Sequence, residues 1–479
     1  MTEGRILVDG DWVASKSGQT EEVRSPYDGR VVGQVAVADV DDVETALAAA
    51  ERGAAVWRET PAHARLDVLM RAAALVEERA DTIAVLLSAE NGKTITEARG
   101  EVGRASDMIR LAGYEGTQLY GDTLPLDANR GTGQDKIGFT LRQPCGVVVA
   151  ITPFNYPSLL VLHKVAPALA AGNAVVLKPA RTTPLTALAL AAAFTDAGLP
   201  PGVLNVLTGP GGRLGDALVS DPRVRKVSFT GSTVVGEHIA RTAGVKKLSL
   251  ELGASCPVVV LPDADIEAAA DAIAAGGYIN AGQVCISVQR VIAHPDVHGD
   301  LLDALVPKVE AIAMGDPSSP DTRLGALISE AEARRVETAL RTAVEGGARL
   351  LTGGDRDGAV LTPAVVDGVH RDAPLNQDEL FGPAVAVSTA DDWQSAIAYA
   401  NSTAYGLGAG VFTKDVSAAV RAIRQIDAGV VHINWTPLWR ADLMPYGGLK
   451  ASGIGKEGFR TAVSEMTEEK TVILHGRPW

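Results

Sequence analysis

Cys285 is the residue of this chain whose surroundings are most typical of a nucleophile. It lies in the stretch AGQVCISVQR, residues 281–290. The Ala/Gly-rich run 270–281 predicts a helix and the β-branched run 288–293 predicts a strand, so Cys285 is expected at a helix-to-strand transition that faces a cleft. A cysteine attacks as its thiolate and needs a neighbour that activates it. A lone cysteine is more often a buried structural residue, so other residues must decide between the two interpretations.

Two polar side chains elsewhere in the chain suit the same chemistry. Glu251 ends an apolar run in the stretch LSLELG, where partial burial would raise its pKa and make it a usable general base. The alternative is a glutamate paired with a nearby cation. Asn155 lies between two prolines in the stretch ITPFNYP and could donate its side-chain N–H to a developing oxyanion. An asparagine in such a stretch is more commonly a turn former.

Four residues near predicted strand ends and turns suit a nucleotide. Lys178 could bind ribose hydroxyls or phosphate, Gly231 permits close backbone approach, and Ser232 opens a helix whose N-terminus could hold a pyrophosphate. Glu379, in the turn ELFGP, could accept hydrogen bonds from a sugar. The alternatives are an exposed lysine, a helix N-cap at Ser232 and a solvated glutamate. The glycine fingerprint of dinucleotide-binding folds is absent at Gly231, and residues 209–215, which begin with a predicted turn, match it only loosely.

An alternation of strands and helices over residues 146–252 must position these side chains. Hydrophobic periodicity predicts strands at 147–152, 174–177, 203–207, 227–230 and 247–251 and helices at 159–171, 184–197 and 233–242. Thr183 is expected to cap the second helix. Such alternation specifies a parallel sheet with helices on both faces, and ligands bind beyond the carboxyl ends of its strands. A second alternation after residue 257 predicts a second α/β domain.

Two further segments are expected to leave the main body. Residues 121–142 combine turn residues with an alternating, strand-like run and predict a hairpin arm. Residues 470–475 predict a terminal strand, which needs a partner, and the sheet of another subunit would supply one.

Composition excludes several classes of function. The formal net charge of −14 argues against nucleic acid as a partner, because phosphate binding needs a basic face. The three cysteines show no metal-ligand spacing, and their small, odd number suits a reducing compartment. The chain has no signal-like N-terminus and no apolar run that could span a membrane. We therefore expect a cytoplasmic protein without a metal site.

Taken together and in order, these motifs resemble the NAD(P)-dependent aldehyde dehydrogenase superfamily over nearly the whole chain. Its elements occur here as PFN, KP, FTGS, LELG, GQxC, ExFGP and PYGGxKxSG. Cys285 follows Glu251 by 34 residues, the usual family separation. The resemblance identifies Cys285 as the nucleophile.

The resemblance implies a fold of three parts. These are a Rossmann-like NAD(P)-binding domain, a second α/β catalytic domain and a small β arm for homodimer or homotetramer formation. The expected boundaries are 1–120 with 145–252, then 253–455, and 121–144 with 456–479.

The resemblance also assigns roles to particular residues. Cys285 attacks the aldehyde, the Asn155 amide and the Cys285 backbone N–H hold the oxyanion, and Glu251 activates the water that hydrolyses the thioester. Lys164 and Glu457 match positions that orient groups or relay protons. The cofactor-contacting positions carried over are Thr152, Pro153, Phe154, Lys178, Arg181, Gly211, Phe229, Gly231, Ser232, Leu252, Glu379 and Phe381. Among them, Lys178 would contact the adenosine ribose, Glu379 the nicotinamide ribose and Phe381 the nicotinamide ring.

One departure from the family pattern concerns the cofactor. Many NAD-preferring relatives carry Glu where this chain has Arg181. A glutamate there would repel a 2′-phosphate, whereas an arginine could pair with it. We therefore expect that NADP is accepted, with a slight preference over NAD; a solvated arginine is the alternative.

A second departure concerns the substrate. The residues around Cys285 and the run 439–445 look most like the lactaldehyde, phosphonoacetaldehyde and non-phosphorylating glyceraldehyde-3-phosphate dehydrogenase branches, which favour small, polar or anionic aldehydes. The expected pocket residues are Arg104, Tyr156, Val284, Ile286 and Arg440. Arg440 and Arg104 are the candidates for a substrate anion, although a solvated or ion-paired arginine on a helix is the alternative for Arg104.

Two other functions compete with hydrolytic aldehyde oxidation. A CoA-acylating aldehyde dehydrogenase shares the fold and the cysteine, but it typically lacks the general-base glutamate that Glu251 supplies. A non-catalytic relative that serves as a binding protein would not need Cys285, Asn155 and Glu251 together.

Overall fold

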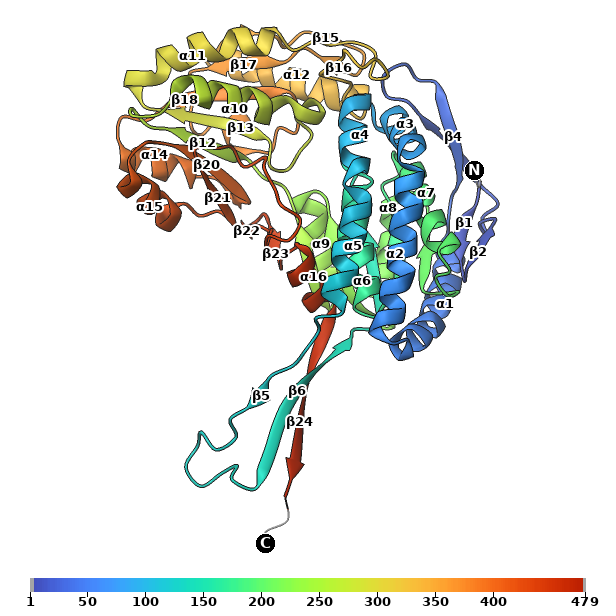
Figure 1. The fold of residues 1–479 in the computed structure, drawn as a ribbon. Coiled ribbons are helices and arrows are strands. Elements are labelled where there is room, and N and C mark those ends of the chain that lie inside the picture. Colours follow the sequence, from blue (N-terminus) through green and yellow to red (C-terminus); the bar gives the residue numbers. More distant parts are fainter. Residues whose placement is uncertain (1–3, 477–479) are drawn as a thin grey trace.

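The main body contains two large sheets, and a narrow arm projects from it (Figure 1). The structure is a computed structural model that describes residues 4–476. The first sheet has the strand order β2-β1-β9-β8-β7-β10-β11-β23. Its strands are β1 (Ile6–Val8), β2 (Asp11–Val13), β7 (Val147–Ile151), β8 (Ala174–Lys178), β9 (Leu204–Val206), β10 (Val224–Thr230), β11 (Lys247–Glu251) and β23 (Gly453–Ile454). The five strands from β7 to β11 are parallel, as predicted.

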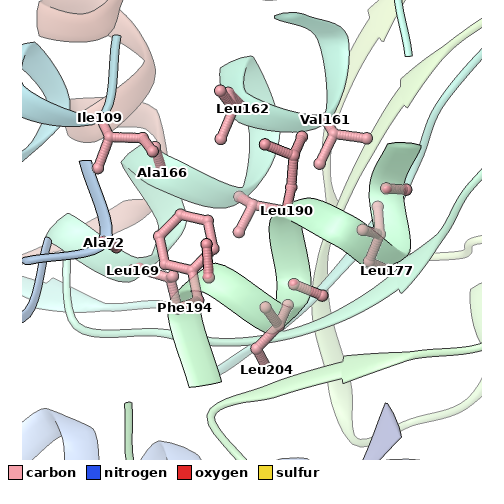
Figure 2. Packing of buried hydrophobic residues seen from close by; sticks show 14 of the residues in the cluster. Ala72, Ile109, Val161, Leu162, Ala166, Leu169, Leu177, Leu190, Phe194 and Leu204 are labelled. Carbon is pink, nitrogen blue, oxygen red and sulfur yellow. The ribbon is translucent and has the colours of Figure 1, made fainter. Parts of the chain in front are cut away.

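Helices cover both faces of this sheet because successive residues of its core strands are apolar, so that both faces must be buried. In β7, Val148 and Ala150 face one hydrophobic cluster and Val147 and Val149 face the other. The first cluster holds α2 (Ala62–Glu78), α3 (Ala80–Asn91), α4 (Ile95–Gly103), α5 (Ala105–Gly116), α6 (Leu159–Ala170), α7 (Pro184–Asp196) and α16 (Phe459–Glu465). The second cluster holds α1 (Val40–Glu59), α8 (Gly211–Ser220) and α9 (Thr233–Thr242). Figure 2 shows part of the first cluster, where Leu162, Leu190 and Phe194 pack over the sheet.

The second sheet has the order β14-β17-β18-β13-β12-β20-β21. Its strands are β12 (Cys256–Val260), β13 (Val288–Ala293), β14 (Arg349–Thr352), β17 (Ala364–Asp367), β18 (Ala384–Thr389), β20 (Gly408–Phe412) and β21 (Val430–Ile433), and only β14 among them runs antiparallel to its neighbour. The helices around it are α10 (Ile266–Tyr278), α11 (Pro295–Glu310), α12 (Glu330–Glu345), α13 (Pro374–Gln377), α14 (Trp393–Ala400) and α15 (Val416–Gln425). Outside the arm, the remaining strands form three two-stranded sheets: β3 (Thr20–Arg24) with β4 (Val31–Ala36), β15 (Arg356–Asp357) with β16 (Val360–Leu361), and β19 (Tyr405–Gly406) with β22 (Leu449–Lys450).

The arm is a three-stranded sheet that extends away from the body (Figure 1). It consists of β5 (Thr123–Leu124), β6 (Lys136–Pro144) and β24 (Thr467–His475), in the order β24-β6-β5. The expectation that the terminal strand needs another subunit is wrong. β24 pairs along its whole length with β6 of the same chain, from Thr467 opposite Pro144 to His475 opposite Lys136.

Two local expectations are also wrong. Thr183 precedes α7 but makes no capping hydrogen bond with its side chain. The buried Glu90 carboxylate of α3 accepts instead from the backbone N–H groups of Leu185 and Thr186, each at 2.8 Å, and thereby satisfies the first turn. The glycine-rich turn predicted at 209–212 runs directly into α8, an amphipathic helix that begins at Gly211.

None of the helices between residues 4 and 476 is long and apolar enough to cross a bilayer.

Candidate active site

Cys285 follows a strained turn and lines a cavity. The turn η1 (Ile279–Gly282) connects α10 to the nucleophile segment, and Asn280 and Ala281 have φ values of 50° and 52° in it. At Gly282, a Cβ would lie 2.0 Å from the carbonyl oxygen of Gly382, so only glycine fits. Cys285 is thus placed between a helix and β13, as predicted, and its side chain is partly exposed.

The cavity has a volume of about 460 Å³ and lies between α4, Arg104 and α6 on one side and the Cys285 segment and residues 435–446 on the other. It is lined by Cys285, by Asn155 and by all five expected pocket residues: Arg104, Tyr156, Val284, Ile286 and Arg440. The exposed Trp435 and Trp439 also line it. The lining is mainly apolar, and Glu97, Glu101, Arg104 and Arg440 are the charged residues in it.

The side-chain amide of Asn155 uses one of its two N–H donors in a hydrogen bond within the protein and leaves the other free. Its Nδ2 donates to the carbonyl oxygen of Gln283 at 2.8 Å, two residues before Cys285. A side-chain amide nitrogen carries two N–H donors, so the second is available to a ligand. The backbone N–H of Cys285 makes no hydrogen bond within residues 4–476. Both donors belong to residues that line the cavity.

Glu251, at the carboxyl end of β11, is buried and both of its carboxylate oxygens lack a hydrogen-bond partner in the described structure. Burial raises its pKa well above the ordinary value, and the negative charge of Glu457 adds to the effect. The glycine-rich segment 445–453 covers the Glu251 carboxylate closely, because a Cβ on Gly447 would lie 2.7 Å from Glu251 Oε1. The alternative of an ion-paired glutamate is wrong, because no salt bridge involving Glu251 occurs in residues 4–476.

Lys164 and Glu457 form a buried ion pair beside Glu251. Lys164 Nζ lies 3.0 Å from Glu457 Oε1, and Arg440 Nη2 lies 3.4 Å from Glu457 Oε2. Burial would raise the pKa of Glu457, but the charges of Lys164, His163 and Arg440 outweigh it and lower that pKa. Glu457 is therefore the charged carboxylate of the site and Glu251 the one pushed toward its neutral form.

Arg104 was expected on a helix. It lies instead at the junction of α4 and α5. It pairs with Asp442 at 2.5 Å and is nearly half exposed, so the ion-paired alternative describes its present contacts. Arg440 is held more loosely, since its closest carboxylate contact is 3.4 Å and its Nε–H has no partner among the described residues.

The carboxyl ends of β7, β8 and β10 form one edge, where most of the expected cofactor residues gather. Thr152, Pro153 and Phe154 follow β7, Lys178 ends β8, and Gly231 with Ser232 follows β10. Along the chain, β8 and β9 extend the sheet to one side of β7, and β10 and β11 extend it to the other. Dinucleotides bind at such reversals of strand order.

Details at this edge fit a nucleotide. Thr230 Oγ1 is buried without a partner in residues 4–476, and Ser232 caps α9 by accepting from Val235 N at 3.5 Å. A Cβ on Gly231 would lie 2.5 Å from the Phe229 ring, so only glycine fits beside that ring. Lys178 is buried, and burial lowers its pKa to about 8. The exposed-lysine alternative is therefore wrong, and the N-cap at Ser232 coexists with the open helix end.

The other expected cofactor residues lie on both sides of this edge. Glu379 is half-buried rather than fully solvated; it accepts from Ala254 N at 3.0 Å, and burial raises its pKa to about 7. Phe381, with φ of 50°, packs edge-on against Phe154 at 5.8 Å. Leu252 packs against α9 at Gly236, whereas Gly211 opens α8 and is exposed.

Comparison with known proteins gives the chain a family. Residues 12–472 match the model of the aldehyde dehydrogenase family. A 3-sulfolactaldehyde dehydrogenase of Priestia aryabhattai is 42% identical over 470 residues, which cover 98% of each chain. The chain belongs to the aldehyde dehydrogenase family. It is therefore an NAD(P)-dependent oxidoreductase, as the sequence motifs predicted.

Two solved structures show the same fold. An NADP-dependent glyceraldehyde-3-phosphate dehydrogenase from Bacillus halodurans C-125, complexed with NADP, superimposes with a TM-score of 0.96 at 36% identity, covering 99% of both chains. An NAD-dependent aldehyde dehydrogenase from Sinorhizobium meliloti also gives 0.96, at 38% identity, covering 100% of this chain and 96% of that one. Both cofactors thus occur among relatives of this dehydrogenase.

The structure shows two groups of residues near the site that the sequence did not indicate. Lys93 Nζ lies 2.6 Å from Glu101 Oε2 and donates to the carbonyl oxygen of Asn155 at 2.7 Å, and this pair is fully buried beside the oxyanion donor. The sequence did contain a signal near it, because Thr94 and Glu97 form a capping box that begins α4. The second is Glu21, on β3, which pairs with Arg181 at 2.7 Å.

Proposed function

We propose that this dehydrogenase oxidises a small anionic aldehyde to its carboxylate, with Cys285 as the nucleophile. The observation that carries the proposal is the cavity itself, in which the thiol, the spare Asn155 donor and the loosely held Arg440 face a space suited to a small molecule. The name of the Priestia relative, 3-sulfolactaldehyde dehydrogenase, supports an anionic substrate.

The proposed reaction follows from the positions of these groups. The Cys285 thiolate attacks the carbonyl carbon, and the oxyanion that forms accepts from Asn155 Nδ2 and the Cys285 backbone N–H. The residues that follow β7, β8 and β10 would hold NAD(P), which would supply the acceptor for the hydride whose loss converts the Cys285 adduct into a thioester. Glu251 then takes a proton from the water that attacks the thioester, the carboxylate forms, and the thiolate leaves. Lys164 and Glu457 remain a charged pair while the Glu251 carboxylate gains and loses its proton.

Replacing Arg440 by alanine is expected to raise KM for an anionic aldehyde about 10- to 100-fold while changing KM for propanal less than threefold, because a charged hydrogen bond is lost only with the anion. Steady-state kinetics with sulfonate, carboxylate and phosphate aldehydes and with propanal measure this effect. Arg460→Ala is the matched control, since Arg460 is exposed and pairs with Glu115 away from the cavity. An equal rise for the anionic and neutral aldehydes would contradict the proposal.

We also propose that NADP is accepted and slightly preferred over NAD, and that Glu21 limits this preference. The Glu21 carboxylate occupies the Arg181 guanidinium, and its second oxygen is buried without a partner in residues 4–476. A 2′-phosphate must compete with that carboxylate for Arg181.

Glu21→Gln is therefore expected to raise the ratio of kcat/KM for NADP to that for NAD about tenfold, and Arg181→Glu to lower it by at least as much. The control is Glu22→Gln, which removes the exposed carboxylate next in the chain. If both Glu21→Gln and Arg181→Glu leave the ratio unchanged, Arg181 does not read the 2′-phosphate.

We also propose a role for each domain and an oligomeric state. We assign NAD(P) binding to 1–120 and 145–252, catalysis to 253–455, and oligomerisation to 121–144 and 456–479 of a cytoplasmic homodimer or homotetramer. Exposed Ile137, Leu141 and Leu474 on the arm support a role in association. Light scattering on the purified protein distinguishes the two assemblies.

A further inference from the structure

Tyr446 reaches the nucleophile from a separate part of the chain. Its hydroxyl oxygen lies 3.2 Å from Cys285 Sγ, and the side chain is 4% exposed. The backbone of Tyr446 is fixed by two hydrogen bonds with Glu457, one in each direction, at 2.9 and 2.6 Å. The ring lies under the Arg440 guanidinium, 4.0 Å from its centroid. The hydroxyl is therefore aimed at the sulfur by contacts that do not involve the sulfur.

The hydroxyl has one polar partner in residues 4–476, and that partner is Cys285 Sγ. Packing under Arg440 needs only an aromatic ring, which phenylalanine would also supply. A thiolate has lone pairs and no proton, so in the reactive state of Cys285 the phenol must be the donor. The structure thus provides an O–H group for the sulfur at the moment when the sulfur is charged.

We infer that Tyr446 is a further catalytic residue, which donates a hydrogen bond to the Cys285 thiolate when it attacks and again when it leaves. In the first step the C–S bond forms and the negative charge passes from sulfur to the carbonyl oxygen. When water has attacked the thioester and lost its proton to Glu251, the C–S bond breaks and the charge returns to sulfur. Tyr446 stabilises the sulfur in both charged states and keeps its proton throughout. This inference rests on the proposed function of Cys285.

The other charges around Cys285 make this donor important. Burial raises the pKa of the Cys285 thiol to about 12, and the Tyr446 hydrogen bond is the largest influence that lowers it. Glu379 and Glu251 raise it further, whereas the Arg440 charge lowers it. Cys256, whose Sγ donates to the Cys285 carbonyl oxygen at 3.4 Å, and Tyr156, which lines the same cavity, are further titratable neighbours. Burial also raises the pKa of Tyr446 well above its usual value, so the phenol remains a donor.

The test is the rate at which iodoacetamide alkylates Cys285 in the full-length protein without cofactor, measured between pH 6 and 10. The rate follows the thiolate fraction, and a hydrogen bond to a charged acceptor shifts a pKa by about one unit or more. Tyr446→Phe is expected to slow alkylation about tenfold at each pH below the midpoint. Cys285→Ala supplies the background from the other two cysteines.

Two comparisons keep the test decisive. Tyr114→Phe, which removes an exposed hydroxyl on α5, is expected to leave the pH profile unchanged. Tyr446→Phe should also lower kcat for aldehyde oxidation more than it changes KM. An unshifted alkylation profile in a folded, NAD(P)-binding Tyr446→Phe protein overturns the inference. Because alkylation needs no aldehyde, that result is distinct from a failure of the wild type to oxidise any aldehyde, which overturns the proposed function itself.

Discussion

Glu251→Gln is expected to stop the dehydrogenase after one turnover per active site. Glutamine keeps the shape of the side chain but cannot take a proton from water, so the thioester on Cys285 accumulates. Loss of a general base costs about 10²–10⁴ in rate, and kcat should fall by that factor while the first turnover stays fast. Stopped-flow absorbance of the reduced cofactor should then show a burst of one equivalent followed by a slow phase.

The pH dependence of the wild type gives an independent check. Burial raises the pKa of Glu251, and only the deprotonated carboxylate acts as a base. The hydrolytic rate should therefore rise with pH through this raised pKa, and Glu251→Gln should lose that limb. Asp265→Asn, which removes an exposed carboxylate at the start of α10 and keeps an oxygen that can cap the helix, is the control and should retain the limb. A glutamine variant that turns over at the wild-type rate would exclude Glu251 as the base.

The same variant separates hydrolysis from CoA acylation. If CoA is the natural acceptor of the acyl group, adding it should restore turnover of Glu251→Gln, and the wild type should release an acyl-CoA. If water is the acceptor, CoA should leave the burst unchanged and the product should be the free acid. The buried, unpaired state of the Glu251 carboxylate favours water.

What the sequence predicted well depends on short-range pattern. The alternation of strand-like and helix-like segments specified the parallel core of the first sheet, and the strand ends placed Lys178, Ser232 and Glu251 at its carboxyl edge. The helix-to-strand transition at Cys285 followed from the change in residue type on either side of it. These features are set by neighbours in the chain, which is why one sequence sufficed.

The features that it missed depend on partners far away in the chain. Glu21 meets Arg181 across 160 residues, and Glu90 meets the start of α7 across 95. The residues around Glu21 and Glu90 do not indicate these distant partners. The sequence therefore predicted an unpaired cation at Arg181 and a helix cap at Thr183. The terminal strand β24 likewise seemed to lack a partner in the sequence, because β6, with which it pairs, precedes it by more than three hundred residues. Burial of a charge is decided by such distant contacts and cannot be inferred from periodicity.

The buried pair Lys93–Glu101 illustrates the consequence for catalysis. Both side chains are shielded from water, with exposures of 0% and 1%. Glu101 Oε1 accepts from the N–H groups of Ser158 and Leu159 at the start of α6, at 2.9 and 3.2 Å. Lys93 donates to the Asn155 carbonyl oxygen, so the pair connects the loop that carries the oxyanion donor to the helix behind it.

Lys93→Met is accordingly expected to lower the free energy of unfolding by about 3–5 kcal/mol, because it leaves the Glu101 carboxylate buried without its cation. It should also lower kcat, since Asn155 loses one of the two donors that fix its backbone. Urea unfolding and steady-state kinetics on the same preparation measure the two effects. Arg334→Met, which breaks an exposed pair on α12, should cost less than about 1 kcal/mol.

A double-mutant cycle then separates positioning from general damage. If Lys93 acts through Asn155, then Lys93→Met should reduce kcat much less in an Asn155→Ala background than in the wild type. Lys93→Met/Glu101→Gln should regain part of the lost stability, because no uncompensated charge remains, yet not the lost kcat, because the donor to Asn155 is still missing. Additive losses of kcat in the cycle would mean that the pair stabilises the fold without positioning the oxyanion donor.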